Sequence, residues 1–203
     1  MTHPGRRAVR QRGISMIEVI VVVSIVGILA VAVAPEISIQ LRNSRVRNVA
    51  ESMQNGLQRA RAEAIARNQN VRFTLVSNLT DSCVASSSAA SWVVSLDDPA
   101  GLCDIAPDPT VEPRTVTLQE ARDGGTGATV SATQGSPFTT AASSITFNPF
   151  GRPINTTQMA RVVVDSAVTP SQHRSYRIDI SPVGSVRMCD RRVTATDDPR
   201  YCP

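Results

Sequence analysis

One acidic residue, Glu18, stands inside an apolar run that extends from Ile14 to Ala34. It is the only charged residue of that run and follows Gly13 by five positions. A carboxylate near the centre of a bilayer costs about 3 kcal/mol, so an acid in such a segment usually has a partner. The run contains no basic residue, so the chain itself offers Glu18 no counter-charge. Cleavage after Gly13 would expose the amine of Ile14, and that amine in a neighbouring copy would make Glu18 an assembly residue.

A second group that could do chemistry is a set of arginines near the C-terminus. Arg187 lies in the stretch Gly184-Ser185-Val186-Arg187, and Arg191 and Arg192 follow closely. Arginines contact phosphates electrostatically and need no base readout, so only a local cluster of this kind could support nucleic-acid binding. The alternative is that they pair with acids of the same segment, which are Asp190, Asp197 and Asp198.

The residues do not predict an enzyme. His173 is the only histidine after the apolar run, and no nucleophile motif or paired carboxylates accompany it. We expect it at the surface beside Arg174. The glycines of "GGTGAT" lack the Gly-Lys-Ser/Thr of a phosphate-binding loop and are expected to form a flexible linker. We expect no cofactor.

Four cysteines follow the apolar run: Cys83, Cys103, Cys189 and Cys202. Cysteines in an exported domain form disulfides, and four of them allow three pairings. Short loops favour Cys83–Cys103 and Cys189–Cys202, and the second bridge would tether the C-terminal tail. A metal site is the alternative, which the lack of any CxxC spacing disfavours.

The overall charge does not indicate a partner. The formal net charge is +4, and every basic residue is arginine. Four of the 21 arginines precede Gly13, and the remaining 17 balance the 17 acids. Nucleic-acid binding can therefore rest only on local clusters.

The elements that position these residues begin with residues 14–34. A helix of this length crosses a hydrocarbon core of about 30 Å, and the arginines before it predict a cytoplasmic N-terminus. A secretory signal peptide is one alternative, because Ala32-Val33-Ala34 has the pattern of a cleavage site, but Pro35 makes that bond a poor substrate. A plain membrane anchor with an accidental acid is the other.

An amphipathic helix is predicted over residues 35–69. Pro35 should kink its junction with the first helix, and Asn68–Asn70 should end it. Its arginines at 42, 45 and 47 could reach anionic headgroups, although a solvated outer face is the favoured interpretation. The apolar stripe, interrupted only at Arg45, consists of Ile37, Leu41, Val49, Met53, Leu57, Ala60 and Ala64.

Residues 70–203 change to the pattern of extended strands. Seven short β-branched runs, separated by turn-rich stretches, predict antiparallel strands: "VRFTLV", "SWVVSL", "RTVTL", "SSITF", "RVVVD", "SYRIDI" and "SVRMC". The segment "DGGTGATVSATQGS" is expected to be a linker. The fold class is α+β, with the helix packed on an antiparallel β-sheet or small β-sandwich.

The stretch "RGISMIEV" before an aliphatic helix resembles the signal of type IV pilins and type II secretion pseudopilins. The resemblance implies that a prepilin peptidase removes residues 1–13, cutting after Gly13, and methylates Ile14. Glu18 would then guide docking into a filament. The family most often has Phe at the position of Ile14. The implied protein is a single-pass inner-membrane subunit. Its β-rich globular domain at 70–203, with a C-terminal disulfide tail, would lie in the periplasm.

Later segments resemble the GspH/FimT branch of this family, although residues 98–140 match no pattern. The segments are "ARAEAIARNQNVRFTL", "SWVVSLDD", "ITFNPFGRP" and "YRIDISPVGSVRMC". The resemblance implies a pilin fold, a minor pilin or pseudopilin, and other such subunits as partners. FimT-type pilins bind double-stranded DNA through Gly-Arg-x-Arg; here Ser185 replaces the first Arg, so only Gly184 and Arg187 carry over. A type IV pilus and a type II secretion pseudopilus without DNA binding remain alternatives.

Overall fold

The computed structural model describes residues 15–121, 127–154, 158–168 and 173–203, with only the backbone for residues 30–36. The leader at 1–13 and Ile14 therefore lie outside the described residues. The chain forms two compact units, Met1–Ser38 and Ile39–Pro203.

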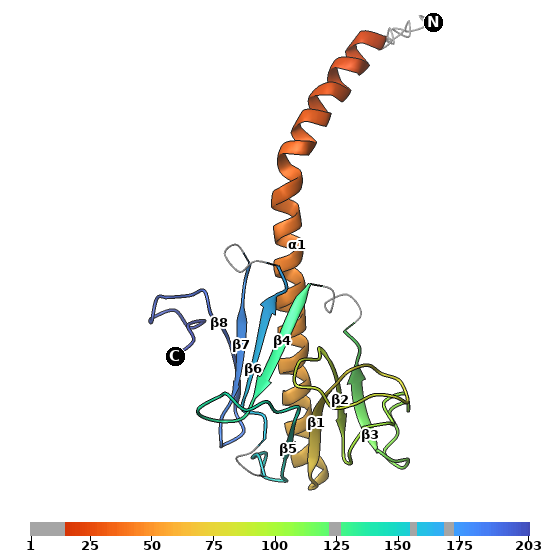
Figure 1. Cartoon of the computed structure of the whole chain (residues 1–203), viewed down its shortest axis with the longest axis vertical. Helices are drawn as coiled ribbons and strands as arrows, with labels where there is room; N and C mark the ends of the chain where they lie inside the picture. Colours follow the sequence, from red (N-terminus) through yellow and green to blue (C-terminus); the bar gives the residue numbers. More distant parts are fainter. Residues whose placement is uncertain (1–14, 122–126, 155–157, 169–172) are drawn as a thin grey trace, which may run out of the picture. The chain divides into compact units, whose positions relative to one another are not determined.

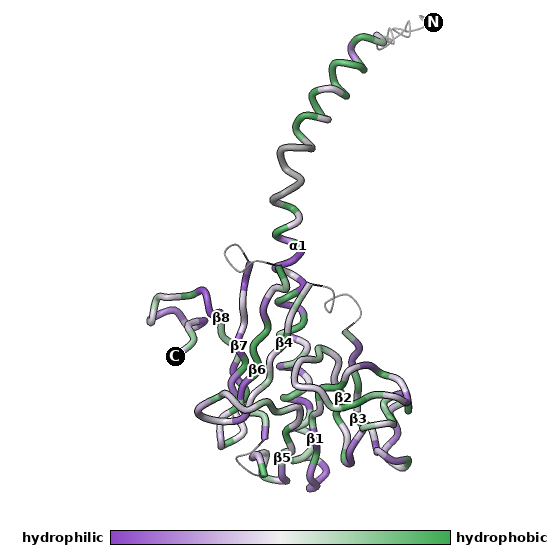
Figure 2. Tube along the Cα trace, in the orientation of Figure 1, coloured by the Kyte–Doolittle hydropathy of each residue, from purple (hydrophilic) through white to green (hydrophobic). Residues whose placement is uncertain are grey.

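A single helix, α1, extends over Met16–Arg67 and contributes to both units (Figure 1). It is continuous through Pro35, so the proline does not break it. In the first unit its residues are predominantly hydrophobic (Figure 2) and their side chains are exposed, from 49% for Val19 to 84% for Met16. In the part of the chain that the structure describes, no helix is long and apolar enough to cross a membrane. The predicted span at 14–34 includes Ile14 and the side chains of residues 30–34, which lie outside that part.

The second unit buries the later part of α1. Its stripe was predicted to begin at Ile37 and Leu41, but these side chains are 53% and 56% exposed, so that prediction is wrong. The buried stripe begins at Val46, because the sheets cover the helix only from there. Its members, at helical spacing, are Val46, Val49, Ala50, Met53, Leu57, Ala60 and Ala64.

The arginines and the C-terminal end of this part of α1 follow the sequence prediction. Arg45 and Arg47 are exposed, as expected for a solvated face, whereas Arg42 is half-buried. Arg47 pairs with Glu51 at 2.6 Å. The helix ends where Asn68 adopts a φ of 52°, a left-handed conformation that asparagine tolerates.

Two antiparallel four-stranded sheets pack on this part of α1 (Figure 1). The first has the order β3-β2-β1-β5 and the second the order β4-β6-β7-β8. The α+β class predicted from the sequence is confirmed. The strands are β1 Val71–Val76, β2 Ser91–Ser95, β3 Thr115–Gln119, β4 Ala128–Thr133, β5 Ser144–Phe147, β6 Arg161–Ser166, β7 Tyr176–Ile180 and β8 Val186–Asp190.

All seven predicted strands are present, but β4 was expected to be a linker. Only Thr129, Val130 and Thr133 of its six residues favour strands, and the glycines on both sides of it indicate a turn-rich segment. Val130 and Ala132 nevertheless alternate toward the core, because all six residues of β4 pair with β6. Tertiary pairing thus makes a strand from a segment of weak local preference.

The main core lies between α1 and both sheets, wholly in the second unit. Gly56 of α1 allows close approach of two aromatic rings: an added Cβ would lie 2.8 Å from Phe73 and 3.0 Å from Trp92. The indole Nε1 of Trp92 donates to Ser52 Oγ at 3.0 Å. Because this core and both disulfides lie within residues 39–203, we expect that fragment to fold on its own.

Two disulfides join Cys83 to Cys103 and Cys189 to Cys202, the pairing that loop length favoured. The first forms a small second core with Val76 and Val93. The second fastens the C-terminal tail, residues 193–203, to β8. No candidate cluster of metal ligands occurs among the described residues.

Candidate assembly and anion-binding sites

Glu18 lies in the first turn of α1, where a carboxylate interacts favourably with the helix dipole. Its backbone N–H donates to Ser15 O at 3.0 Å. The side chain is exposed among exposed apolar neighbours, and the next basic residue along the chain is Arg42. Gly13 and Ile14, the predicted cleavage and methylation residues, lie outside the described residues.

Gly184 is a packing residue in the turn between β7 and β8. Its φ is 81°, a conformation that favours glycine, and its N–H donates to Ser181 O at 2.8 Å. An added Cβ would lie 1.8 Å from the carbonyl oxygen of Gly151. Arg61 of α1 donates from Nε to that same oxygen at 3.1 Å. Gly184 therefore has a structural reason to be glycine that is independent of DNA.

Arg187 projects from the outer face of β8 and is held by the C-terminal tail. Its guanidinium donates to the carbonyl oxygens of Pro199 and Tyr201, each at 3.2 Å. Arg177 of the neighbouring strand donates to Pro203 O at 2.6 Å. Backbone acceptors of the tail thus occupy two arginines of this face.

Arg200 of the tail forms an ion pair within the tail and a backbone hydrogen bond to β8. The Arg200 guanidinium hydrogen-bonds to Asp198 and lowers the pKa of that carboxyl to about 2. The Arg200 carbonyl accepts a hydrogen bond from Asp190 N–H at 2.8 Å. Together with the Cys189–Cys202 disulfide, these contacts keep the tail against β8.

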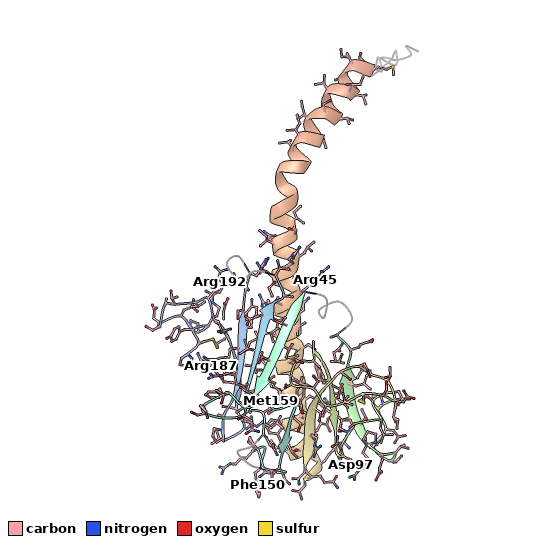
Figure 3. The ribbon with its side chains drawn as sticks, viewed as in Figure 1. Arg45, Asp97, Phe150, Met159, Arg187 and Arg192 are labelled. Atoms are coloured by element: carbon pink, nitrogen blue, oxygen red, sulfur yellow. A yellow bond between two sulfur atoms is a disulfide. The ribbon has the colours of Figure 1, made fainter. Side chains whose placement is uncertain are left out.

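Arg191 and Arg192 lie at the other end of β8, and Figure 3 shows Arg187 and Arg192 well apart along this strand. Arg191 pairs with Asp165 at 3.3 Å and donates to Ser175 Oγ at 3.2 Å. Arg192 donates to His173 O at 3.3 Å. Arg191 also lines a pocket with Tyr201, whose carbonyl oxygen accepts a hydrogen bond from Arg187, whereas Gly184 is buried in the turn between β7 and β8.

A polar cavity of about 590 Å³ adjoins Arg191 and Arg192. Sequence reasoning missed Arg174, which also lines it and which pairs with the buried Asp190 at 2.6 Å. His173 was expected at the surface, but it is only 8% exposed, so that expectation is wrong. The reason is that its loop folds against α1, where Arg174 N–H donates to Asn43 Oδ1 at 2.8 Å. The cavity is thus lined by three arginines, Arg174, Arg191 and Arg192, and by one acid, Asp165.

The sequence family described as Type II transport protein GspH matches residues 49–184. The chain belongs to the GspH family. A second description, the Prokaryotic N-terminal methylation motif, matches residues 9–34. No curated protein matches the chain in sequence.

Two crystal structures of the type IV minor pilin FimU from Pseudomonas aeruginosa are similar to this GspH-family chain. The first has a TM-score of 0.47 and 12% identity, and covers 70% of this chain and 90% of FimU. The second has a TM-score of 0.44 and 15% identity, and covers 71% and 88%.

The two matches include some of the candidate residues and leave out others. Gly13, Ile14 and Glu18 lie in the methylation motif. Gly184 is the last residue of the GspH match. Arg187, the cavity arginines Arg191 and Arg192, and the tail follow it, so the basic residues proposed for DNA lie outside the part that defines the GspH family.

Proposed function

We propose that this GspH-family chain is a pilin-like subunit of an envelope filament, anchored in the inner membrane by α1 with residues 39–203 in the periplasm. The observation that carries the proposal is the methylation motif over residues 9–34, which continues into a helix whose apolar side chains are exposed. Such side chains need lipid or neighbouring helices around them, because their hydration is unfavourable.

Processing would complete the assembly site. A prepilin peptidase would remove residues 1–13 and methylate Ile14, and the new amine would lie near Glu18 of an adjacent subunit. This supplies the counter-charge that the chain itself lacks between Gly13 and Arg42.

Mass spectrometry of the mature protein tests this proposal. The expected N-terminus is Ile14 with a methyl group on its amine. Retention of residues 1–13 contradicts the proposal, and so does a mature chain that begins at Pro35, because each removes the amine. A Gly13→Glu variant, in which the peptidase site is lost, serves as the unprocessed reference.

Two machines could use such a subunit, a type IV pilus and a type II secretion pseudopilus. The description of the family supports the second, in which the subunit acts in protein export. Deletion of the chain separates them: loss of exoprotein export with normal pili indicates the pseudopilus, and loss of pili with normal export indicates the pilus.

Duplex DNA binding is a second candidate function, favoured by the polar cavity beside Arg191 and Arg192. Arg174 is a third cationic group at that cavity, and Arg174 N–H contacts α1 at Asn43. We propose that these three arginines, rather than Arg187, carry the phosphate contacts.

A salt titration of residues 39–203 with duplex DNA tests this second candidate. Arg191→Ala/Arg192→Ala should weaken binding and reduce the slope of log K against log salt by about 0.9 for each lost phosphate contact. Arg59→Ala, which removes an exposed arginine of α1, is the matched control. Salt-independent binding, or binding unchanged in the double variant, excludes the candidate and leaves the export role.

A further inference from the structure

Phe150 is the one exposed aromatic side chain among the seven aromatic residues of the chain. It is 82% exposed, whereas the other six are buried or half-buried. It lies in the turn after β5, within the segment "ITFNPFGRP", at the end of the second unit farthest from Arg45 (Figure 3). Aromatic residues displayed in this way are typical anchors of protein interfaces.

Hydrogen bonds within the turn and to α1 fix the backbone that carries Phe150. Asn148 Oδ1 accepts hydrogen bonds from the N–H groups of Phe150 and Arg152, both at 3.0 Å. Asn148 N–H donates to Arg152 O at 2.8 Å, and Gly151 N–H donates to Asn148 O at 2.8 Å. Arg61 then fastens Gly151 to α1. A side chain presented by a pre-organised turn loses little conformational entropy when it binds.

Two other exposed apolar residues surround the same turn. Ile65 of α1 is 51% exposed, and its Cδ1 would lie 2.8 Å from a Cβ on Gly151. Val183 is 59% exposed and precedes Gly184, which packs on Gly151. Arg61 and Arg152 border them, and no ion pair among the described residues involves either arginine. We call Ile65, Phe150, Val183, Arg61 and Arg152 the Phe150 patch.

A surface of complementary chemistry exists on the same chain. The Cys83–Cys103 disulfide crosslinks residues 79–112. We call these residues the acidic lobe. Their exposed apolar side chains are Val84 at 59%, Leu102 at 37% and Val111 at 49%. Their exposed acids without an ion pair among the described residues are Asp81, Asp104 and Glu112.

The Phe150 patch and the acidic lobe belong to different connections of one sheet. In the order β3-β2-β1-β5, the turn of Phe150 follows β5, whereas residues 79–90 of the acidic lobe connect β1 to β2 and residues 96–112 connect β2 to β3. Both surfaces are exposed within one chain, so neither covers the other there, and a second chain can bring them together. A contact between unlike surfaces is heterologous and repeats from subunit to subunit.

We propose that the Phe150 patch docks on the acidic lobe of a second copy of this chain. Phe150, Ile65 and Val183 would cover the exposed apolar residues of the lobe, while Arg152 faces its unpaired acids. The contact goes beyond membrane anchoring, because both surfaces lie in residues 39–203. Its failure would therefore leave the processing of the N-terminus, and the test of that processing, unaffected.

Photo-crosslinking of the full chain in phospholipid vesicles tests the contact. A benzophenone side chain at position 150, in a mixture of light and isotopically heavy copies, should form crosslinks between copies that map to residues 79–112. The same probe at Val168, a residue with 42% exposure outside both surfaces, is the control. Absence of crosslinks between copies, or crosslinks mapped elsewhere, overturns the proposal.

Charge reversal separates this contact from non-specific proximity. Arg152→Glu and Glu112→Arg should each lower the crosslink yield about tenfold, because like charges then face each other. The two variants mixed together should restore the yield. Arg47→Glu, at an exposed arginine outside the patch, should leave it unchanged. Unaltered melting temperatures confirm that the variants fold, and a yield indifferent to Arg152→Glu, or not restored in the mixture, overturns the proposal.

Discussion

Gly184 packs directly on the backbone carbonyl of Gly151, so that even a methyl group has no room between the two turns. The same carbonyl accepts a hydrogen bond from Arg61. The contact joins α1, the turn after β5 and the turn before β8, which are three parts of the chain far apart in sequence. It makes the glycine a stability determinant of the second unit.

Gly184→Ala should therefore destabilise residues 39–203 strongly. The new methyl group clashes with Gly151 and also requires a left-handed conformation, which together cost about 2–4 kcal/mol. Gly101→Ala is the matched control. Gly101 has a φ of 77°, but the atom nearest to an added Cβ, the carbonyl oxygen of Asp81, lies 3.8 Å away. Urea unfolding should show a cost of only about 1 kcal/mol for the control. Equal losses in both variants would mean that the contact with Gly151 is unimportant.

Glu18→Ala should leave the chain in the membrane and reduce its incorporation into the filament. The substitution removes the only charge of the exposed apolar part of α1, so membrane insertion becomes easier while the counter-charge for the neighbour disappears. Fractionation followed by quantification in sheared filaments measures both effects. Glu51→Ala, which removes a carboxylate of α1 in the second unit, should behave as the wild type. Normal incorporation of Glu18→Ala would contradict the assembly role.

Replacing Cys189 and Cys202 by serine should release the C-terminal tail. The bridge closes a loop of 13 residues, and its loss is expected to cost up to about 3 kcal/mol. Trypsin should then cleave after Arg200 faster, because the carbonyl of Arg200 no longer stays on Asp190 N–H. Replacement of Cys83 and Cys103 is the control, and should leave cleavage at Arg200 unchanged. Equal cleavage rates in the wild type and the tail variant would show that hydrogen bonds alone hold the tail.

The ion pair between Asp97 and Arg114 should make stability depend on pH in the acid range. Hydrogen bonds from Arg114, at 2.6 and 2.7 Å, lower the pKa of Asp97 below its ordinary value of 3.8. Because the pKa of Asp97 is lower in the folded state, the ionised carboxylate stabilises the fold at pH values above its ordinary pKa. This contribution is lost as pH falls through the folded-state pKa. Arg114→Ala should thus lower the melting temperature at neutral pH, with a difference that shrinks as pH falls below the ordinary pKa of Asp97. A difference that stays constant with pH would exclude this pair as the cause.

Much of the secondary structure followed from local patterns. The helix beyond Pro35 and seven strands were recognised because helical spacing and β-branched runs reflect burial of one face. The strand β4 was missed, since Ala128–Thr133 is a strand only through its pairing with β6. Ile37 and Leu41 continue the stripe in sequence but precede the part of α1 that the sheets cover.

The sequence by itself determined the character of the N-terminal segment and the pairing of nearby cysteines. Both depend on residue type and on separation along the chain, which are complete in the sequence. Only the tertiary structure decided that Gly184 is a packing residue, that tail carbonyls hold Arg187, and that Arg191 and Arg192 belong to a different end of β8. The physical reason is that such contacts join elements far apart in the sequence, as Arg61 and Gly151 do across 90 residues. No local pattern marks them, because their positions follow from how the helix and two sheets pack together.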